Sequence, residues 1–313
     1  MKMQPAHIAG ALILSLALLV ISTVAHPQGQ PGYSKVEIKT TKVADNFYTL
    51  EGQGGMIGIL AGSDGVLMVD SQFAPLTGKI VAAVKQITSE PIRFMVNTHL
   101  HPDHTGGNEN LGKMGVIIIG RDELRKRLAE GAPAVNGAGG RAPAPAVALP
   151  LITYEGKLTF HIDGEDVELI PVPHAHTDGD TIVRFPKANV IMTGDFYRSV
   201  GYPNIDRASG GTLDGTIAGL AYVVSLAASD TKIIPGHGPT VSRDDVSACR
   251  DMIVDVRDHV AQLMREGKSL QDVIAARPTA AYDARVPQAA ETSERFVTQV
   301  YAELRPAISG TGQ

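Results

Sequence analysis

The chain has 313 residues, of which 43% are hydrophobic and 19% are charged, so it can bury a sizeable core and wholesale disorder is not expected. Its formal net charge of −5 and its lack of tryptophan argue against a polyanionic partner, and no nucleic-acid partner is expected. The single cysteine, Cys249, excludes an intrachain disulfide.

The N-terminus has the pattern of a secretory signal peptide. Lys2 precedes an uncharged apolar run, residues 8–25, which ends at the small residue Ala25. We expect residues 1–25 to be a signal peptide that is cleaved near Ala25, and residues 26–35 to be a linker rich in Pro, Gly and Gln. The mature protein would then be periplasmic or secreted, with no membrane attachment. The alternative is an uncleaved N-terminal membrane anchor, because the apolar run is nearly long enough to span a bilayer.

Strand-like and helical patterns follow one another along the rest of the chain. Short apolar runs bounded by turn residues predict strands over residues 35–40, 46–52, 55–62, 65–70, 92–98, 116–120, 157–163, 166–172, 181–186, 189–195 and 232–238. Helical spacing predicts helices over residues 77–87, 121–130, 211–228, 242–266, 269–277 and 291–305. Residues 131–149 are rich in Ala, Gly and Pro and indicate either a lid or a disordered insertion. We predict one α/β domain with mixed sheets over residues 36–313, ending in helices.

One short segment concentrates side chains that bind metals. The stretch NTHLHPDHTGGN, residues 97–108, contains His99, His101, Asp103 and His104. Pro102 argues against a helix here, whereas in an extended segment residues two apart point the same way, so His99 and His101 would converge. Neutral imidazoles and a carboxylate suit a borderline metal ion such as zinc.

Three later apolar runs end in the same kind of residue. His174 and His176 follow the first run, Asp195 follows the second, and His237 follows the third. Each stands beside glycine or another turn residue, and one metal ion needs more than two ligands. The repeated arrangement therefore predicts that the ends of several strands meet around a metal site.

In these motifs the chain resembles the metallo-β-lactamase superfamily. The stretch at residues 99–104 carries the H-x-H-x-D-H motif in full, and HAHTDGD, TGD and PGHG match the remaining ligand motifs in order, over roughly residues 40–240. The resemblance implies an α/β fold in which two mixed β-sheets pack face to face in an αββα sandwich flanked by helices. It also implies a site along one sheet edge.

The resemblance further implies two zinc ions. The first would be held by His99, His101 and His176, the second by Asp103, His104 and His237, and Asp195 would bridge them. His176 is assigned in preference to His174 because the family's ligand directly precedes Thr or Ser. Asp70 is expected to support the ligand loop, and the loop from Gly52 to Met56 resembles a flexible hairpin that covers such sites.

The function implied by the resemblance is that of a hydrolase. A hydroxide shared by two zinc ions would attack a small carbonyl substrate, either a β-lactam or another cyclic amide, a lactone or an ester. Asp103 would orient that nucleophile. Arg198, three residues after Asp195, is expected to bind the substrate with Tyr197, although Arg198 could equally be a surface residue.

One departure from the β-lactamase pattern keeps other activities open. Two-zinc β-lactamases often carry cysteine at the position of Asp195. The aspartate is typical of the wider hydrolase superfamily, so a phosphodiesterase or a sulfatase is an alternative. An iron-dependent oxidoreductase of the sulfur dioxygenase type is a further alternative. The sequence does not specify the oligomeric state.

Overall fold

The computed structural model describes residues 32–132 and 140–305. The expected signal peptide and its cleavage site near Ala25 lie outside the described residues. Among the helices within the described ranges, none combines the length and apolar character needed to cross a membrane.

Seven described strands form the first sheet, in the order β1-β2-β3-β4-β5-β6-β7. They are β1 (Lys39–Lys42), β2 (Phe47–Glu51), β3 (Ile57–Gly62), β4 (Gly65–Val69), β5 (Ile92–Val96), β6 (Ile117–Arg121) and β7 (Ile152–Tyr154). The pairs from β1 to β4 are antiparallel and those from β4 to β7 are parallel, so the sheet is mixed. The parallel half needs crossover connections, which α1 (Thr77–Ile87), α3 (Asn108–Lys113) and α4 (Asp122–Glu130) supply.

Five described strands form the second sheet, in the order β12-β11-β10-β9-β8. They are β8 (Leu158–Ile162), β9 (Glu165–Val172), β10 (Asp180–Phe185), β11 (Val190–Met192) and β12 (Lys232–Ile234). Only the β11–β12 pair is parallel, because α5 (Leu213–Leu226) crosses between those two strands. The second sheet is therefore also mixed.

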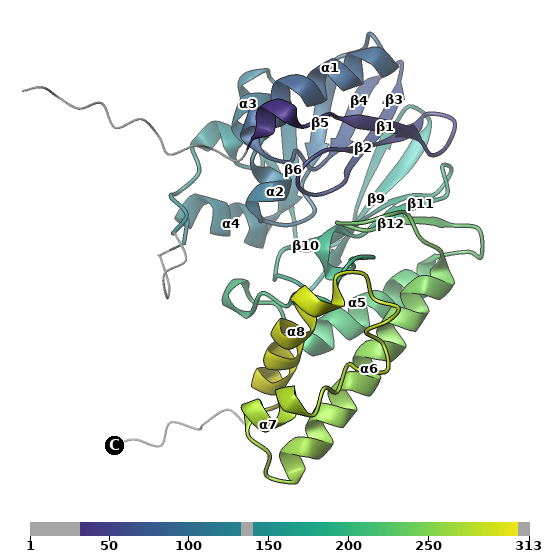
Figure 1. Cartoon of the computed structure of the whole chain (residues 1–313). Coiled ribbons are helices and arrows are strands. Elements are labelled where there is room, and N and C mark those ends of the chain that lie inside the picture. The colour runs from purple at the N-terminus through teal and green to yellow at the C-terminus, as the bar shows by residue number, and fades with distance from the viewer. Residues whose placement is uncertain (1–31, 133–139, 306–313) are drawn as a thin grey trace, which may run out of the picture. The chain divides into compact units, whose positions relative to one another are not determined.

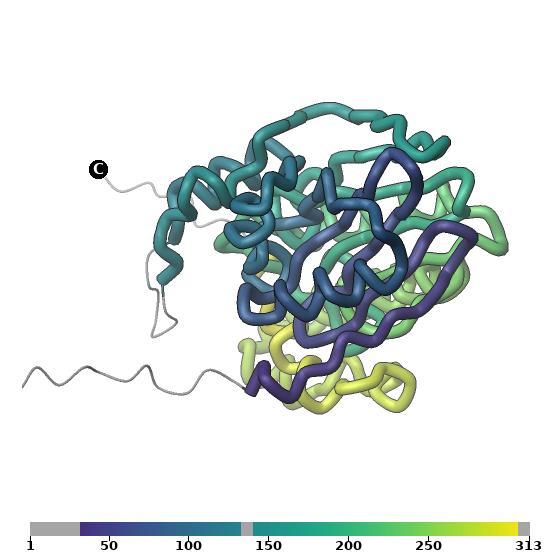
Figure 2. Tube along the Cα trace, turned by 90° about the horizontal axis from the view of Figure 1, so that it is seen from above, coloured from purple at the N-terminus to yellow at the C-terminus, as the bar shows by residue number. Residues whose placement is uncertain are grey.

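The two sheets pack face to face with helices outside, as the family resemblance implied. Leu67 and Val69 of β4 point into the apolar cluster between the sheets, whereas Val66 and Met68 point outward onto α1. On the second sheet, the outer face of β9 packs against α5, α6 (Arg243–Arg265) and α8 (Ala289–Leu304). Figure 1 shows α1 and α3 over the first sheet, and α5, α6 and α8 beyond the second. Seen from above, α1 and the first sheet lie nearest the viewer (Figure 2).

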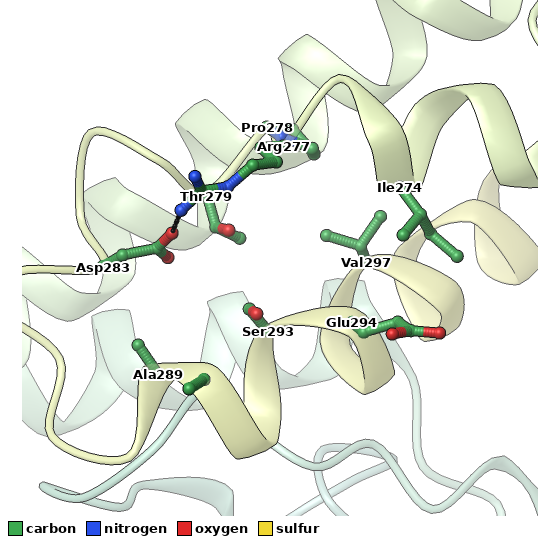
Figure 3. Close-up of a pocket in the computed structure, with 10 residues that line it drawn as sticks. Ile274, Arg277, Pro278, Thr279, Asp283, Ala289, Ser293, Glu294 and Val297 are labelled. Carbon is green, nitrogen blue, oxygen red and sulfur yellow. Dashed lines mark hydrogen bonds and ion pairs between the residues drawn. The ribbon is translucent and has the colours of Figure 1, made fainter.

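The last helices are defined by capping residues. Ser242 and Asp245 form a reciprocal capping box at the start of α6, and Ser269 and Asp272 form another at the start of α7 (Leu270–Ala275). Figure 3 shows a cavity of about 370 Å³ between the segment after α7 and one face of α8. Arg277 and Asp283 form an ion pair at its rim, 2.9 Å apart.

Several local predictions were wrong. Residues 35–40 were expected to form a strand, but a 3-10 turn ends at Lys35 and β1 begins only at Lys39. The short strand β7 was missed, because its three residues follow the segment 131–149, which was predicted as a loop. In that segment, residues 133–139 lie outside the described residues. The following residues are packed, since Ala144 and Leu149 contact an apolar cluster that includes Leu128.

The prediction that Pro102 excludes a helix was also wrong. Strand β5 ends at Val96, and Pro102 is the first residue of the one-turn helix α2 (Pro102–Thr105). Proline is tolerated at that position, because the amide group it lacks would have no partner within the helix. His101 precedes the helix in an extended conformation.

Candidate metal centre

The seven predicted ligands lie where the segments after β5, β9, β11 and β12 meet. His99 and His101 follow β5, and the turn of α2 carries Asp103 and His104. The other three come from the segments after the second sheet's strands: His176, Asp195 and His237. Both sheets thus contribute, and the side chains gather into two neighbouring groups.

The first group contains three imidazoles. His99, His101 and His176 each offer one nitrogen, and these nitrogens all lie within 4.8 Å of one another. The Nε2 atom of His176 lies 2.9 Å from Nδ1 of His101. His99 and His176 are buried, whereas the side chain of His101 is 23% exposed. Three convergent nitrogens of this kind are a common zinc-binding set.

The second group contains two carboxylates and two imidazoles. Ligand atoms of Asp103, His104, Asp195 and His237 also lie within 4.8 Å of one another. The Oδ1 atom of Asp195 is 3.2 Å from Nε2 of His104 and 3.3 Å from Nε2 of His237. Oδ2 of Asp103 is 3.1 Å from Nε2 of His237. Asp103 and His237 are partly exposed, whereas His104 is fully buried.

Unpartnered buried atoms show that these residues fit a metal. Nε2 of His99, Nε2 of His104 and Oδ1 of Asp195 are buried and make no well-aligned hydrogen bond within the described residues, although the last two atoms face each other at 3.2 Å as an ion pair. A buried polar atom without a partner is costly, so such atoms are rare unless an ion or water satisfies them. The three atoms belong to both groups, and a cation in each group would satisfy them all.

Four of the five histidines have one ring nitrogen facing a ligand group, and their other ring nitrogen faces a polar partner outside it. Nδ1 of His99 faces the hydroxyl of Thr98 at 3.1 Å, and Nδ1 of His104 faces Oδ2 of Asp70 at 2.7 Å. Nε2 of His101 lies 2.9 Å from Oδ2 of Asp206, and Nδ1 of His176 lies 2.5 Å from the carbonyl oxygen of Asn204. Such partners orient ligating imidazoles and fix their tautomers.

Asp70 supports the ligand loop, as predicted. Its carboxylate accepts hydrogen bonds from the backbone amide and the hydroxyl of Thr98, at 2.8 and 2.7 Å, as well as facing His104. Asn204 and Asp206 were not predicted as site residues. An aspartate before a short turn was the only available signal, and many aspartates in the chain share it.

The charges of the second group balance one another. Burial lowers the pKa of His104, but Asp195 and Asp70 together raise it well above its ordinary value. Burial raises the pKa of Asp195, but the neighbouring His104 lowers it more. The pKa of Asp195 therefore lies well below its ordinary value. Burial likewise lowers the pKa of His237, but hydrogen bonds to Asp103 and Asp195 raise it overall. Without a cation, protons on these imidazoles offset the carboxylates.

The first group behaves differently. Burial is the main reason that the pKa of His99 lies well below its ordinary value, and neighbouring His104 lowers it further. Burial also lowers the pKa of His176 to about 4, although Asp195 opposes the shift. Both imidazoles are therefore neutral near pH 7, which is the form that binds metal.

The loop between Gly52 and Met56 packs directly against the second group. The backbone amide of Gly55 donates to the carbonyl of Asp103 at 3.0 Å, and that of Met56 donates to the carbonyl of Gly236 at 2.8 Å. A Cβ atom at position 55 would lie 2.1 Å from the ring of His104. Glycine is therefore required at position 55 by the close approach of this imidazole.

The remaining predicted site residues lie outside the two groups. His174 is exposed, and its ring faces the carbonyl of Gly210 at 3.0 Å. Tyr197 is 4% exposed within the apolar cluster of the C-terminal helices, so its side chain offers little surface to a substrate. Arg198 lines a cavity of about 610 Å³ between residues 197–201 and α6, and none of the seven ligand-type residues lines that cavity.

Comparison with known proteins places these features in a family context. A family model described as the metallo-beta-lactamase superfamily matches residues 51–248, a range that contains all seven ligand-type residues. The linear primary-alkylsulfatase of Pseudomonas sp. (strain ATCC 19151) is 23% identical over 251 residues, which are 67% of this chain and 47% of that protein. The chain thus spans about half the length of this curated relative.

Solved structures show the same fold. The metallo-beta-lactamase from Pontibacter korlensis matches with a TM-score of 0.57 at 18% identity, covering 70% of this chain and 100% of its own. The stereoselective inverting sec-alkylsulfatase Pisa1 from Pseudomonas sp. matches with a TM-score of 0.61 at 15% identity, covering 88% of this chain and 51% of its own.

Proposed function

The chain belongs to the metallo-β-lactamase superfamily, and we propose that it is a hydrolase that uses two zinc ions. The observation that carries the proposal is the pair of adjacent ligand groups, in which three buried nitrogen and oxygen atoms make no well-aligned hydrogen bond within the described residues. His99, His101 and His176 would hold one ion. Asp103, His104 and His237 would hold the other, with Asp195 between them. The donor set of imidazoles and carboxylates suits zinc.

The chemistry follows from how the residues are exposed. Zinc ions bound in such pairs activate a water molecule as a nucleophile and stabilise negative charge on the substrate. In the second group the side chains of Asp103 and His237 are 24% and 19% exposed, whereas His104 is buried, and in the first group only His101 is exposed, at 23%. The substrate therefore approaches from the side of Asp103. The carboxylate of Asp103 is ionised, because the hydrogen bond from His237 outweighs burial and lowers its pKa. This carboxylate can accept a hydrogen bond from the attacking water molecule and so orient it.

The leading substrate class is a small carbonyl compound: a β-lactam or other cyclic amide, a lactone or an ester. We assign Arg198 to an anionic group of a substrate that extends from the metal centre into the cavity beside α6, which Arg198 lines. Its Nε atom is buried and has no hydrogen-bond partner, and it stands three residues after Asp195. Export through the N-terminal segment is part of the same proposal, since an exported hydrolase would meet its substrate outside the cytoplasm.

An alkyl sulfate is the second candidate substrate. The alkylsulfatase structure covers 88% of this chain, whereas the metallo-beta-lactamase structure covers 70%. The family model ends at residue 248, within α6, so α7 and α8 lie beyond it. Because the alkylsulfatase structure covers more of this chain than the metallo-beta-lactamase structure does, it favours an alkylsulfatase-like arrangement for part of the chain outside residues 51–248.

A panel assay distinguishes these substrates. Zinc-loaded protein would be tested with a chromogenic cephalosporin, lactones, thioesters, phosphodiesters and alkyl sulfates, beside a His104→Ala variant as the control for contaminating activity. We expect turnover of a carbonyl substrate that the variant lacks. Turnover of alkyl sulfates alone would select the second candidate. Turnover that is unchanged in the variant, or that survives removal of the metal, would contradict a metal hydrolase.

A further inference from the structure

A single segment holds two of the three histidines of the first group. Residues 201–207 include Asn204, whose carbonyl oxygen faces Nδ1 of His176 at 2.5 Å. Two residues later, Oδ2 of Asp206 lies 2.9 Å from Nε2 of His101. Any shift of this segment would therefore turn two imidazoles together, because both depend on it for their orientation.

One amide side chain of helix α8 contacts the middle of that segment. Oε1 of Gln299 accepts a hydrogen bond from the backbone amide of Ile205 at 3.1 Å. Its Nε2 donates to Oδ1 of Asn204 at 2.9 Å and to the carbonyl of Ile205 at 3.1 Å. The side-chain amide of Gln299 thus bonds both the backbone amide and the carbonyl of Ile205, which lies between Asn204 and Asp206.

Neighbouring residues on the same face of α8 extend the contact. The hydroxyl of Thr292 accepts from the backbone amide of Tyr202 at 2.9 Å, and Arg295 donates to the carbonyl of Tyr202 at 3.1 Å. Glu303 pairs with Arg207 at 2.5 Å. Other residues of α8, among them Ser293 and Glu294, instead line the cavity of Figure 3. One face of α8 therefore contacts residues 202–207.

We propose that Gln299 is a positioning residue for the first metal group. It acts through Asn204 and Asp206 and sets the orientation of His176 and His101 toward a bound ion. The inference rests on the proposed metal centre. The second group is supported by different contacts, from Asp70 and from the loop at Gly55. The C-terminal helix would thus tune one metal ion of the pair.

Zinc titration of the full-length protein tests this assignment. Metal-free protein would be titrated against a chromogenic zinc chelator for the wild type, Gln299→Met and Gln299→Glu. Methionine keeps the side-chain length without the hydrogen bonds, and glutamate keeps only the acceptor for the amide of Ile205. We expect Gln299→Met to weaken binding of one ion by about tenfold, the lower end of the loss seen when an orienting partner is removed. Gln299→Glu should weaken binding at least as much, because its second carboxylate oxygen would face Oδ1 of Asn204 and the carbonyl of Ile205 in place of the donor.

Two backgrounds identify which ion is affected. In His237→Ala, which leaves the first group intact, Gln299→Met should still weaken zinc binding about tenfold. In His176→Ala, which leaves the second group intact, it should change nothing. Thr298→Ala is the matched control on α8, because the hydroxyl of Thr298 bonds only to the carbonyl of Glu294 in the same helix. It should leave both affinities unchanged.

Three outcomes would overturn the inference. Unchanged affinity for both ions in Gln299→Met would show that the amide does not act on the metal. Equal weakening of both ions, together with a lower melting temperature of the metal-free protein, would show a general structural role. Wild-type protein that binds no zinc would remove the proposed function itself, and the inference with it.

Discussion

Nε2 of His101 lies 2.9 Å from the carboxylate of Asp206, while Nδ1 of the same ring lies 2.9 Å from Nε2 of His176. The two ring nitrogens of His101 therefore contact different partners. Nδ1 faces the first metal group, and Nε2 is occupied by Asp206. Burial opposes ionisation of this carboxylate, but hydrogen bonds from His101 and Ser209 lower its pKa, so it is charged at neutral pH.

Replacing Asp206 should weaken the first metal group. Asp206→Asn keeps the shape of the side chain but removes its charge, so we expect zinc affinity to fall roughly 10-fold, and Asp206→Ala to cost more. The measurement is zinc competition with a chelator. Asp166→Asn is a matched control, because Asp166 pairs with His161 at 2.7 Å on the exposed surface. Equal effects of the two asparagine variants would contradict the assigned role of Asp206.

Adding a methyl group at position 55 should disturb the second metal group. Gly55→Ala would place Cβ 2.1 Å from the ring of His104, so either the loop or the imidazole must move. We expect a loss of about 1–3 kcal/mol in the free energy of unfolding, as for other overpacked sites, together with weaker binding of one zinc ion. Urea unfolding and metal analysis measure the two effects.

Gly78→Ala provides the control for that substitution. Position 78 lies in α1, and a Cβ atom there would have nothing within 4 Å. Alanine at this position should keep or raise stability, since it favours helix by up to about 1 kcal/mol over glycine. If Gly55→Ala behaved like Gly78→Ala, the close packing of the loop on His104 would be refuted.

Zinc binding at the second group should release protons. The raised pKa values of His104 and His237 favour their protonated forms, and zinc must displace those protons to bind. Affinity for this ion should therefore rise with pH up to those raised pKa values and level off above them. At the first group, His99 and His176 have lowered pKa values and have no proton to release near pH 7.

Calorimetry can separate the two groups. Titrations of the His176→Ala variant, which retains the second group, would be run in buffers with different ionisation enthalpies. We expect release of roughly one to two protons per zinc ion. In the His237→Ala variant, which retains the first group, His99 and the intact His176 should release none. Zinc affinity of the second group that did not change between pH 6 and pH 8 would contradict the charge balance described here.

The two histidines of the HAH motif should respond differently to substitution. His176→Ala removes a fully buried member of the first group and should abolish turnover. His174 is exposed and has a positive φ of 56°, so asparagine, which tolerates that conformation, is the appropriate replacement. His174→Asn should keep most of the turnover in the panel assay. Equal loss of bound metal in both variants would show that the ligand choice is wrong.

Apolar periodicity predicted most of the strands and helices directly, whereas the face-to-face layering of the two sheets was implied by the resemblance to the metallo-β-lactamase superfamily. Helix α1 was predicted over its full extent, since Ile80 and Val84 repeat at helical spacing. The one-turn helix α2 was not predicted, because a single turn has no periodicity. Proline also gave no clear signal, since it interrupts a helix in its interior but is tolerated at the first helical position. The strand β7 was missed for a similar reason: its three residues are too few to show alternation.

The gathering of ligand-type residues at several strand ends could be predicted from their chemistry and their position after apolar runs, and the family resemblance supplied the set of seven. Their supporting partners could not, with the exception of Asp70. Asn204 contributes a backbone carbonyl, which any residue could supply. Gln299 acts on that segment from 95 positions away in the sequence, and only the packing of α8 brings the two together.

Crystallography of the zinc-loaded protein, with anomalous scattering measured at the zinc edge, tests the metal centre most directly. We predict two anomalous peaks, one among His99, His101 and His176, and one among Asp103, His104 and His237, with the carboxylate of Asp195 between them. A single peak, or a peak that lacks any of these side chains as its neighbours, would contradict the two-ion site.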